Sequence, residues 1–112
     1  MTSVKAQLSI ERSTEAPGIL LRLGGELDAS SAPELERRLR ELSDEGHPRV
    51  LLDLSGLSFV DSAGVSVLIR AKHDAEERGY TLILRRPTPQ VQGVFALLGL
   101  LRWLEPDGGT TA

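Results

Sequence analysis

Residues 61–64, Asp-Ser-Ala-Gly, are the part of this chain whose residue types and spacing come closest to a catalytic motif. They follow an apolar stretch, which predicts that Ser62 lies at a turn from a strand into a helix. A nucleophile elbow has Gly-x-Ser-x-Gly at such a turn, but Val60 occupies the first glycine position. Of the two histidines, His47 lies in a predicted turn, and His73 lies ~16 Å further along the same predicted helix. The spacing therefore argues against a serine hydrolase.

Phosphate-binding loops and metal sites receive little support from the sequence. The chain contains neither Gly-x-x-x-x-Gly-Lys-Ser/Thr nor Gly-x-Gly-x-x-Gly, and the acidic residues Glu26 and Asp28 follow its Gly-Gly pair. Asp28, Asp53 and Asp61 follow predicted strands, where three carboxylates could converge on a magnesium ion. Acidic residues at strand ends more often form caps and turns. We therefore expect no metal and no cofactor.

Ser62 also suits a different kind of chemistry, covalent modification. Serine and aspartate are ordinary residues at a helix start, and capping is the simplest role for either. An exposed hydroxyl at a helix N-terminus is also a place where a phosphate is tolerated, because free N–H groups and the positive end of the helix dipole favour negative charge. Gly64 would allow the backbone or a partner to approach closely.

Hydrophobic periodicity predicts which elements position these residues. Strands have a repeat of two residues and helices a repeat of 3.6. Strands are expected at residues 7–12, 19–23, 50–54 and 80–84, with a turn at 14–18 and a connection at 55–60. Helices are expected to begin at a capping box in residues 31–34, at Asp61 and at Thr88.

Each predicted helix has an apolar stripe that would face a sheet. The expected stripes are Leu35, Leu39 and Leu42 in the first helix; Val65, Leu68, Ile69 and the stem of Lys72 in the second; and Val91, Val94, Phe95, Leu98 and Leu101, widened by Leu97 and Trp103, in the third.

The order β-β-α-β-α-β-α predicts an α/β fold. Two strand–helix–strand units imply parallel strands joined by right-handed crossovers, and the first strand can pair antiparallel with the second through Pro17-Gly18. We expect a small mixed four-stranded sheet packed against three main helices. Residues 1–105 would form a single domain, and residues 106–112 a flexible tail.

Composition limits the partners and the location. The 112 residues include no cysteine, which excludes disulfides and thiolate chemistry. A net charge of −3 argues against nucleic acid or an anionic membrane as the main partner. No apolar run approaches the ~20 residues needed to span a bilayer, and the first five residues lack the apolar core of a secretion signal. We expect a cytoplasmic protein without membrane insertion.

Residues 59–65, Phe-Val-Asp-Ser-Ala-Gly-Val, resemble the central motif of the STAS domain, specifically of the bacterial anti-sigma factor antagonists. Other segments are similar to this family in the same order: residues 25–28 with 31–35, residues 50–55, and residues 95–100. The resemblance covers about residues 6–105.

The resemblance implies a regulatory switch and no enzyme activity. Ser62 would be phosphorylated by an anti-sigma factor with GHKL-type serine kinase activity, and a PP2C-type phosphatase would reset it. The unphosphorylated protein would bind that kinase and release a sigma factor. Asp61 precedes the serine as in the family, and Asp28 matches an acid at the end of the second strand. Ser66 stands where many relatives have glycine. It is either a second modified site or a surface residue of the helix, and we favour the surface residue.

We expect the partner surface around Ser62, on the loop after the second strand, the connection after the third strand and the first turns of the second helix. Leu57 and Phe59 are its candidate apolar contacts, although a core position is slightly favoured for Phe59. An alternative implied by the same resemblance is an interaction subunit of a membrane lipid-transport complex. A small-ligand or nucleotide-binding role has no specific support. The full expected surface is Asp28, Ser30, Ser31, Leu57, Phe59, Asp61, Ser62, Ala63, Gly64, Val65 and Ser66.

Overall fold

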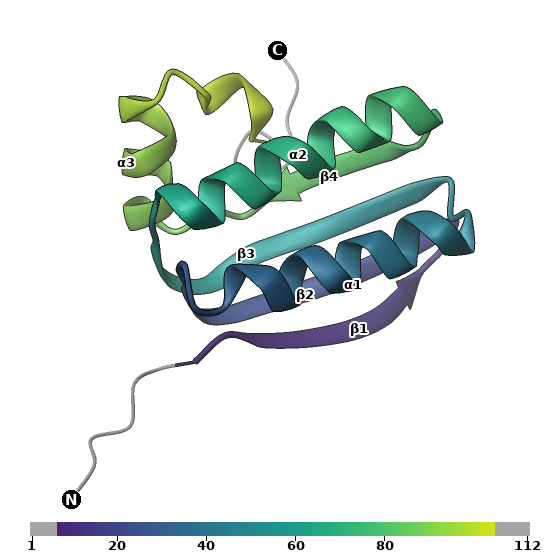
Figure 1. Ribbon diagram of the computed structural model, residues 1–112, viewed down its shortest axis with the longest axis horizontal. Helices are drawn as coiled ribbons and strands as arrows, with labels where there is room; N and C mark the ends of the chain where they lie inside the picture. Colours follow the sequence, from purple (N-terminus) through teal and green to yellow (C-terminus); the bar gives the residue numbers. More distant parts are fainter. Residues whose placement is uncertain (1–6, 105–112) are drawn as a thin grey trace, which may run out of the picture.

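The computed structural model describes residues 7–104, which form a four-stranded sheet with its helices packed around it (Figure 1). The predicted tail at 106–112 and the predicted domain limit at 105 lie outside the described residues. The elements are β1 (Ser9–Glu15), β2 (Gly18–Leu27), α1 (Ala32–Glu45), β3 (Arg49–Val60), α2 (Ser62–Arg78), β4 (Thr81–Arg85), α3 (Pro89–Leu97) and a 3₁₀ turn, η1 (Leu101–Trp103).

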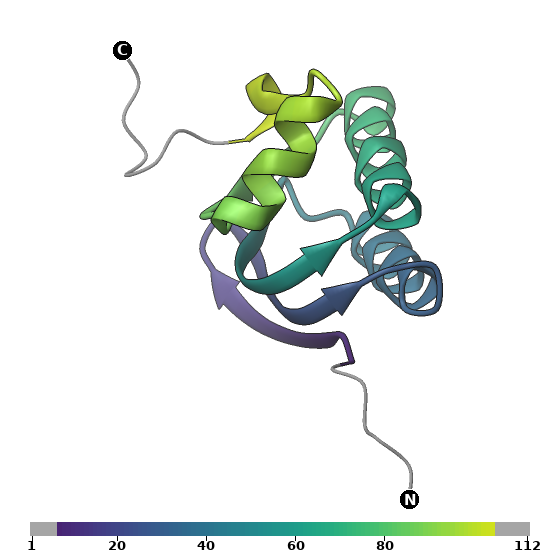
Figure 2. The same ribbon diagram turned by 90° about the vertical axis from the view of Figure 1, so that its left-hand side faces the viewer.

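The topology confirms the predicted order of strands and helices. The sheet order is β1-β2-β3-β4, with β1 antiparallel to β2 and the other neighbours parallel. Because both crossovers step in the same direction along the sheet, α1 and α2 lie side by side on one face (Figure 2). The third helix lies at the end of the sheet where the parallel strands end (Figure 1). Ser62, at the end of β3, is therefore at the same end of the molecule as α3.

The third strand is longer than its apolar run predicts. Residues 55–60, for which the sequence predicts a connection, are its second half and pair with the end of β2. Two irregularities in the β2–β3 register accompany this pairing. Gly56 allows the close approach, since a Cβ there would lie 2.7 Å from the carbonyl oxygen of Leu23. Because Ser55 and Gly56 interrupt the apolar run, hydrophobic periodicity does not predict the second half of β3.

The core is built from aliphatic residues, with Phe95 as its one fully buried aromatic side chain among residues 7–104. The predicted α1 stripe is confirmed. In α2, Val65 and Leu68 are buried as predicted, but Ile69 is only half-buried and the buried set also includes Val67, Ala71 and Ala75. In α3 only Val91 and Phe95 are buried. Leu98 and Leu101 are about half exposed, because the helix ends at Leu97.

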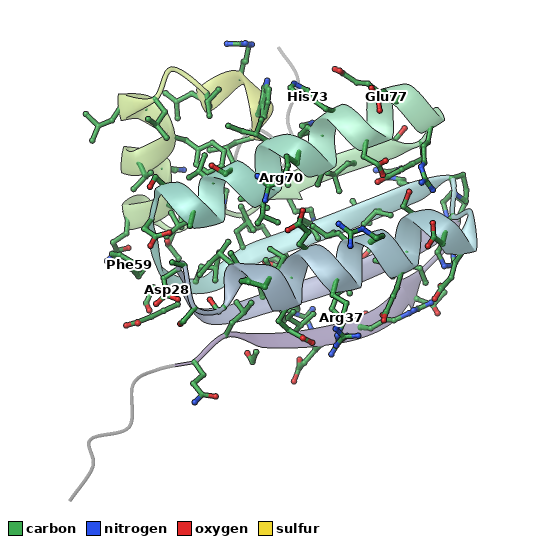
Figure 3. The ribbon with its side chains drawn as sticks, viewed as in Figure 1. Asp28, Arg37, Phe59, Arg70, His73 and Glu77 are labelled. Carbon is green, nitrogen blue, oxygen red and sulfur yellow. The ribbon has the colours of Figure 1, made fainter. Side chains whose placement is uncertain are left out.

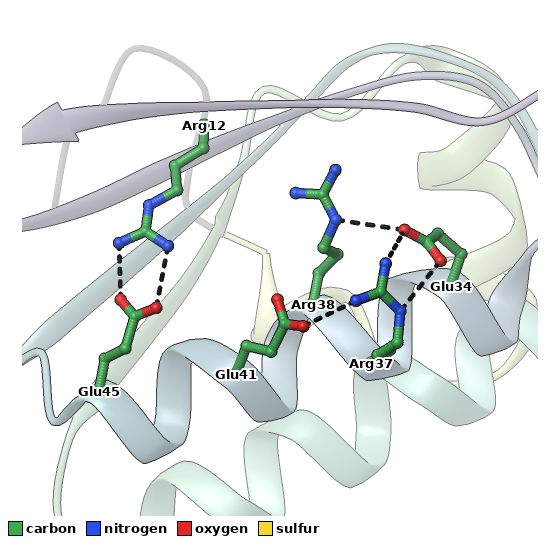
Figure 4. A network of polar contacts seen from close by, with 6 residues as sticks. All are labelled: Arg12, Glu34, Arg37, Arg38, Glu41 and Glu45. Carbon is green, nitrogen blue, oxygen red and sulfur yellow. Dashed lines mark hydrogen bonds and ion pairs between the residues drawn. The ribbon is translucent and has the colours of Figure 1, made fainter.

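The predicted capping box at the start of α1 is wrong. Ser31 makes no side-chain cap hydrogen bond to the helix. The Glu34 carboxylate instead binds Arg37 and Arg38 on the helix surface (Figure 4). Ser31 is half-buried and turns its hydroxyl toward the preceding loop. The motif has the right residue types, but tertiary partners compete for both side chains.

Acid should weaken the fold through Glu45. Its carboxylate accepts two hydrogen bonds from Arg12 at 3.1 and 2.6 Å (Figure 4). Arg12, with a smaller contribution from His47, lowers the pKa of Glu45 from 4.5 to about 2. A carboxyl with a lowered folded-state pKa stabilises the fold above its unfolded pKa, and this contribution disappears as the pH falls through the folded value.

We expect Glu45→Gln to reduce the fall in melting temperature between pH 4.5 and pH 2, with little change at pH 7. Thermal melts over a pH series would measure this, and high salt should shrink the difference because the pair is exposed. Identical pH profiles for the variant and the wild type would contradict the assignment.

Candidate functional site

Asp61 joins the start of α2 to the loop after β2. It is the N-cap of α2, and its Oδ1 accepts a hydrogen bond from the Gly64 amide at 3.0 Å. Its Oδ2 accepts one from the Ala29 amide at 3.3 Å, and its own amide donates to the Leu27 carbonyl at 3.2 Å. The cap predicted from the sequence is confirmed. The link to Ala29 could not be predicted, because it joins segments far apart in the sequence.

Ser62 is the first residue of α2 and is exposed. Within residues 7–104 its hydroxyl makes no hydrogen bond, while its carbonyl accepts one from the Ser66 hydroxyl at 2.9 Å. Residues in the first turn of a helix also have amides without intrahelical partners. The Ser62 hydroxyl is therefore accessible, at the positive end of the α2 dipole. Ser66 is exposed one turn later, as expected.

Gly64 sets how closely this turn packs against the sheet. A Cβ at Gly64 would lie 2.7 Å from Leu27 Cγ, 2.8 Å from the Leu27 carbonyl oxygen and 2.9 Å from Val60 Cγ2. Real Cβ atoms essentially never approach other atoms so closely. The glycine thus lets α2 begin directly against the ends of β2 and β3, and this contact fixes the position of Ser62.

The loop from Asp28 to Ser31 is held by hydrogen bonds between its own residues. Asp28 Oδ1 accepts from the Ser30 amide at 3.0 Å, the Ser30 hydroxyl at 2.7 Å and the Ser31 amide at 3.2 Å. The Ser31 hydroxyl accepts from the Asp28 amide at 3.0 Å and donates to the Glu26 carbonyl at 2.9 Å. These bonds and the Asp61–Ala29 contact hold the loop beside Ser62.

The structure corrects the expected apolar contacts of the partner surface. Leu57 is fully buried and Val65 is 2% exposed, so neither side chain can contact a partner. Phe59 is 46% exposed, and the slightly favoured core position is wrong. The cause is the β2–β3 irregularity, where pairing passes from Gly25–Leu57 to Glu26–Phe59 and the period-two alternation is broken.

The remaining residues of the expected surface differ in their accessibility. Ser30, Ser62 and Ser66 are exposed, and Gly64 is buried. The half-buried members are Asp28, Ser31, Asp61 and Ala63.

The site lies in an acidic part of the chain. Residues 23–36 and 50–69, which build it, contain no lysine or arginine, whereas Glu26, Asp28 and Asp61 carry carboxylates. Figure 3 shows Asp28 and Phe59 at the same end of the molecule. A concavity of about 440 Å³ borders the Asp28–Ser31 loop. A phosphate on Ser62 would find no basic side chain in these two segments to neutralise it.

Asp53 does not join Asp28 and Asp61 in a metal site. It lies within β3, is almost fully buried, and pairs with Arg22 and Arg86 at 3.5 and 3.7 Å. Burial raises the pKa of Asp53, but the Ser55 hydrogen bond and the two arginines outweigh it, so the pKa is lowered overall. Residues 7–104 contain no group of three or more His, Asp or Glu side chains able to hold a metal ion.

The two histidines are engaged away from Ser62. His47 Nε2 lies 2.7 Å from the Glu45 carboxylate, and the His73 ring packs edge-on against Trp103. A second concavity, of about 580 Å³, lies between α1 and α2 and is crossed by the Glu36–Arg70 pair. No helix in the described part of the chain is both long and apolar enough to cross a membrane.

We expect Asp61→Ala to lower the unfolding free energy by about 0.5–2 kcal/mol, the usual cost of losing an N-cap. It should also increase amide exchange at Ala29, because the Asp61 side chain is the acceptor for that amide. Thr88→Ala removes the cap of α3 in the same way and serves as a control. Equal exchange at Ala29 in Asp61→Ala and in wild type would show that Asp61 does not hold the loop.

Comparison with known proteins decides the family. The family model described as "Mlab, STAS domain" matches residues 10–106. The chain belongs to the STAS domain family. This STAS domain is 30% identical over 87 residues to the anti-sigma F factor antagonist of Lysinibacillus sphaericus, a match covering 77% of the chain and 74% of that relative. It is 25% identical to the anti-sigma-B factor antagonist of Staphylococcus aureus (strain NCTC 8325 / PS 47), covering 92% of the chain and 95% of the relative.

Solved structures agree with this family and fold. The anti-sigma factor antagonist SpoIIAA in its unphosphorylated form is 26% identical, with a TM-score of 0.75, covering 86% of this STAS domain and 85% of that chain. The Bacillus cell fate determinant SpoIIAA in its phosphorylated form has a TM-score of 0.69 at 24% identity, covering 86% and 88% of the respective chains. Both forms of that protein have the fold of this domain.

Proposed function

We propose that this STAS domain is an anti-sigma factor antagonist that is switched by phosphorylation of Ser62. The observation that carries the proposal is the exposed Ser62 hydroxyl, free of hydrogen bonds within residues 7–104, at the start of α2. The relatives support it: two are named anti-sigma factor antagonists, and SpoIIAA has both an unphosphorylated and a phosphorylated form. The domain then acts by binding, without catalysis of its own.

In the proposed cycle, unmodified protein binds an anti-sigma factor with GHKL-type serine kinase activity and thereby releases a sigma factor in the cytoplasm. The kinase phosphorylates Ser62, and a PP2C-type phosphatase restores the hydroxyl. The Asp28–Ser31 loop, Phe59 and the exposed first turn of α2 form the docking surface. Asp61 and Gly64 act indirectly, by positioning that turn.

Phosphorylation would change the docking surface more than the fold. A phosphate adds about −1.5 to −2 charges at a site whose two segments carry no basic residue. The amides at the start of α2 can accept part of this charge, so the domain itself tolerates the modification. A partner carboxylate or carbonyl oxygen approaching the same amides would meet the phosphate instead, and binding would weaken.

Intact-mass measurement tests the proposal directly. After incubation with ATP and the anti-sigma factor kinase from the same genome, wild-type protein should gain the mass of one phosphoryl group, and Ser62→Ala should gain none. Ser66→Ala, one turn away and also exposed, is the matched control and should be modified like the wild type. Modification of Ser62→Ala would place the acceptor elsewhere and refute the assignment.

The second candidate is an interaction subunit of a membrane lipid-transport complex. The observation that favours it is the family model, whose description names Mlab and not an anti-sigma factor antagonist. Co-purification separates the two candidates: a soluble GHKL-type kinase is expected under the proposed function, and a membrane ATPase complex under the alternative.

A further inference from the structure

The C-terminal part of the structure exposes a group of leucines. Leu97 is 88% exposed, Leu98 51% and Leu101 52%, and we call these three residues the α3 leucine face. Residues 87–101 contain no charged side chain. The exposed surface of α1, in contrast, is covered by ion pairs such as Arg37–Glu34 and Arg37–Glu41 (Figure 4).

The α3 leucine face is not part of the hydrophobic core. Val91 and Phe95 are the residues of α3 that face inward. Leu97 follows Phe95 by two residues, which is about 200° around a helix, and its side chain therefore points away from the sheet. A cluster of exposed leucines without interspersed charges is typical of a surface that another molecule covers.

The surface around Ser62 lacks the apolar centre that an interface needs. Leu57 and Val65 are buried, which leaves Phe59 as the large apolar side chain exposed among the residues expected there. Its other exposed members, such as Ser30, Ser62 and Ser66, are small and polar. A stable interface usually buries ~800 Å² on each partner around an apolar core. A partner bound at Ser62 must therefore find apolar surface nearby.

The α3 helix lies where such surface is required. Figures 2 and 3 place α3 at the same end of the molecule as the start of α2 and the labelled Phe59 and Asp28. The Thr88 hydroxyl donates to the Leu57 carbonyl at 2.9 Å, which fastens the beginning of α3 to β3 close to Phe59. Phe59 thus lies near the beginning of α3, and Leu97 lies nine residues, or ~14 Å, further along the helix axis.

We infer, on the basis of the proposed function, that the anti-sigma factor kinase that docks at Ser62 also covers the α3 leucine face. The interface then has two parts: a polar part at Ser62, which phosphorylation controls, and an apolar part at the end of α3 and the start of η1, which supplies affinity. The apolar part carries no charge, so its contribution does not depend on salt or on phosphorylation. Arg102, which follows Leu101, is the one basic residue of the adjoining turn, and a single arginine gives little attraction to an anionic membrane.

The test compares Leu97→Ser with Gln92→Ser, a matched control at another exposed position of α3. The binding probe is the purified anti-sigma factor kinase that binds unmodified wild-type protein. Leu97→Ser should weaken binding about tenfold and Gln92→Ser should not. Both should melt close to wild type, because neither side chain is in the core. The loss in Leu97→Ser should persist at high salt, and Leu97→Met should restore most of the affinity.

Three other outcomes would contradict this inference, and the last of them would also contradict the proposed function. Wild-type affinity in Leu97→Ser together with weak binding in Ser62→Glu would overturn this inference and leave the proposed function intact. If wild-type protein sediments as a dimer, Leu97→Ser sediments as a monomer and kinase affinity is unchanged, the face binds a second copy and the inference is wrong. If no anti-sigma factor kinase binds wild-type protein, the proposed function fails, and this inference fails with it.

Discussion

Ser62→Glu should bind the anti-sigma factor kinase at least about tenfold more weakly than Ser62→Ala, while both variants melt near the wild-type temperature. Ser62 is exposed and its hydroxyl makes no hydrogen bond within residues 7–104, so either substitution leaves the fold unchanged. A partner carboxylate ~4 Å from the new charge would experience ~4 kcal/mol of repulsion at an effective dielectric of 20. Half of that repulsion already lowers affinity more than tenfold.

Titration calorimetry of the two variants against the same kinase measures this difference, and circular dichroism verifies their folds. Ser66→Glu is the matched control, since it adds the same charge one turn further along α2. It should weaken binding less than Ser62→Glu if the charge acts at the helix start. Tight binding by Ser62→Glu would show that one negative charge is insufficient, and tight binding by authentic phospho-Ser62 protein would refute the switch.

Gly64→Ala should lower the unfolding free energy by about 1–3 kcal/mol, although alanine is the better helix former. The added Cβ would clash with Leu27 and Val60, and the backbone carbonyl of Leu27 cannot move aside as a flexible side chain can. The first turn of α2 must then shift away from the sheet and take Ser62 with it. Phosphorylation by the kinase should therefore slow in this variant, at temperatures where it remains folded.

Gly93→Ala provides the matched control for this prediction. Gly93 is also inside a helix, but a Cβ there would have no atom within 4 Å. This variant should gain up to about 1 kcal/mol in stability from helix propensity. Urea unfolding should show a lower unfolding free energy for Gly64→Ala and a higher one for Gly93→Ala. Stabilisation by Gly64→Ala would mean that α2 does not pack as closely on β2 and β3 as described.

Hydrophobic periodicity correctly predicted elements, such as α1, in which one side is buried along the whole length. The Leu35, Leu39 and Leu42 stripe specified α1 and its buried face, because a helix on a sheet buries one side along its whole length. Asp61 and Thr88 marked the starts of α2 and α3, since each side chain caps an amide three residues further along. The order of the elements then left few topologies open, and the mixed sheet follows from it.

Where two elements meet, the sequence did not predict the orientation of individual side chains correctly. The β2–β3 irregularity turns Phe59 outward and leaves Leu57 inside, and no local pattern encodes a register shift. Ser31 and Glu34 have the sequence of a capping box, but their side chains bind loop and surface partners instead. In both cases the outcome depends on the competition between a local interaction and a tertiary one.

The order of strands and helices, the Asp61 cap and the position of Ser62 at the start of a helix can be predicted from the sequence, because they depend on neighbours within a few residues. Which side chains at that end are accessible depends instead on tertiary packing. It connects Asp61 to Ala29, packs Gly64 against Leu27 and brings α3 beside Phe59. Burial and long-range hydrogen bonds depend on how β2, β3 and α3 meet in space, and a pattern along one segment does not contain that information.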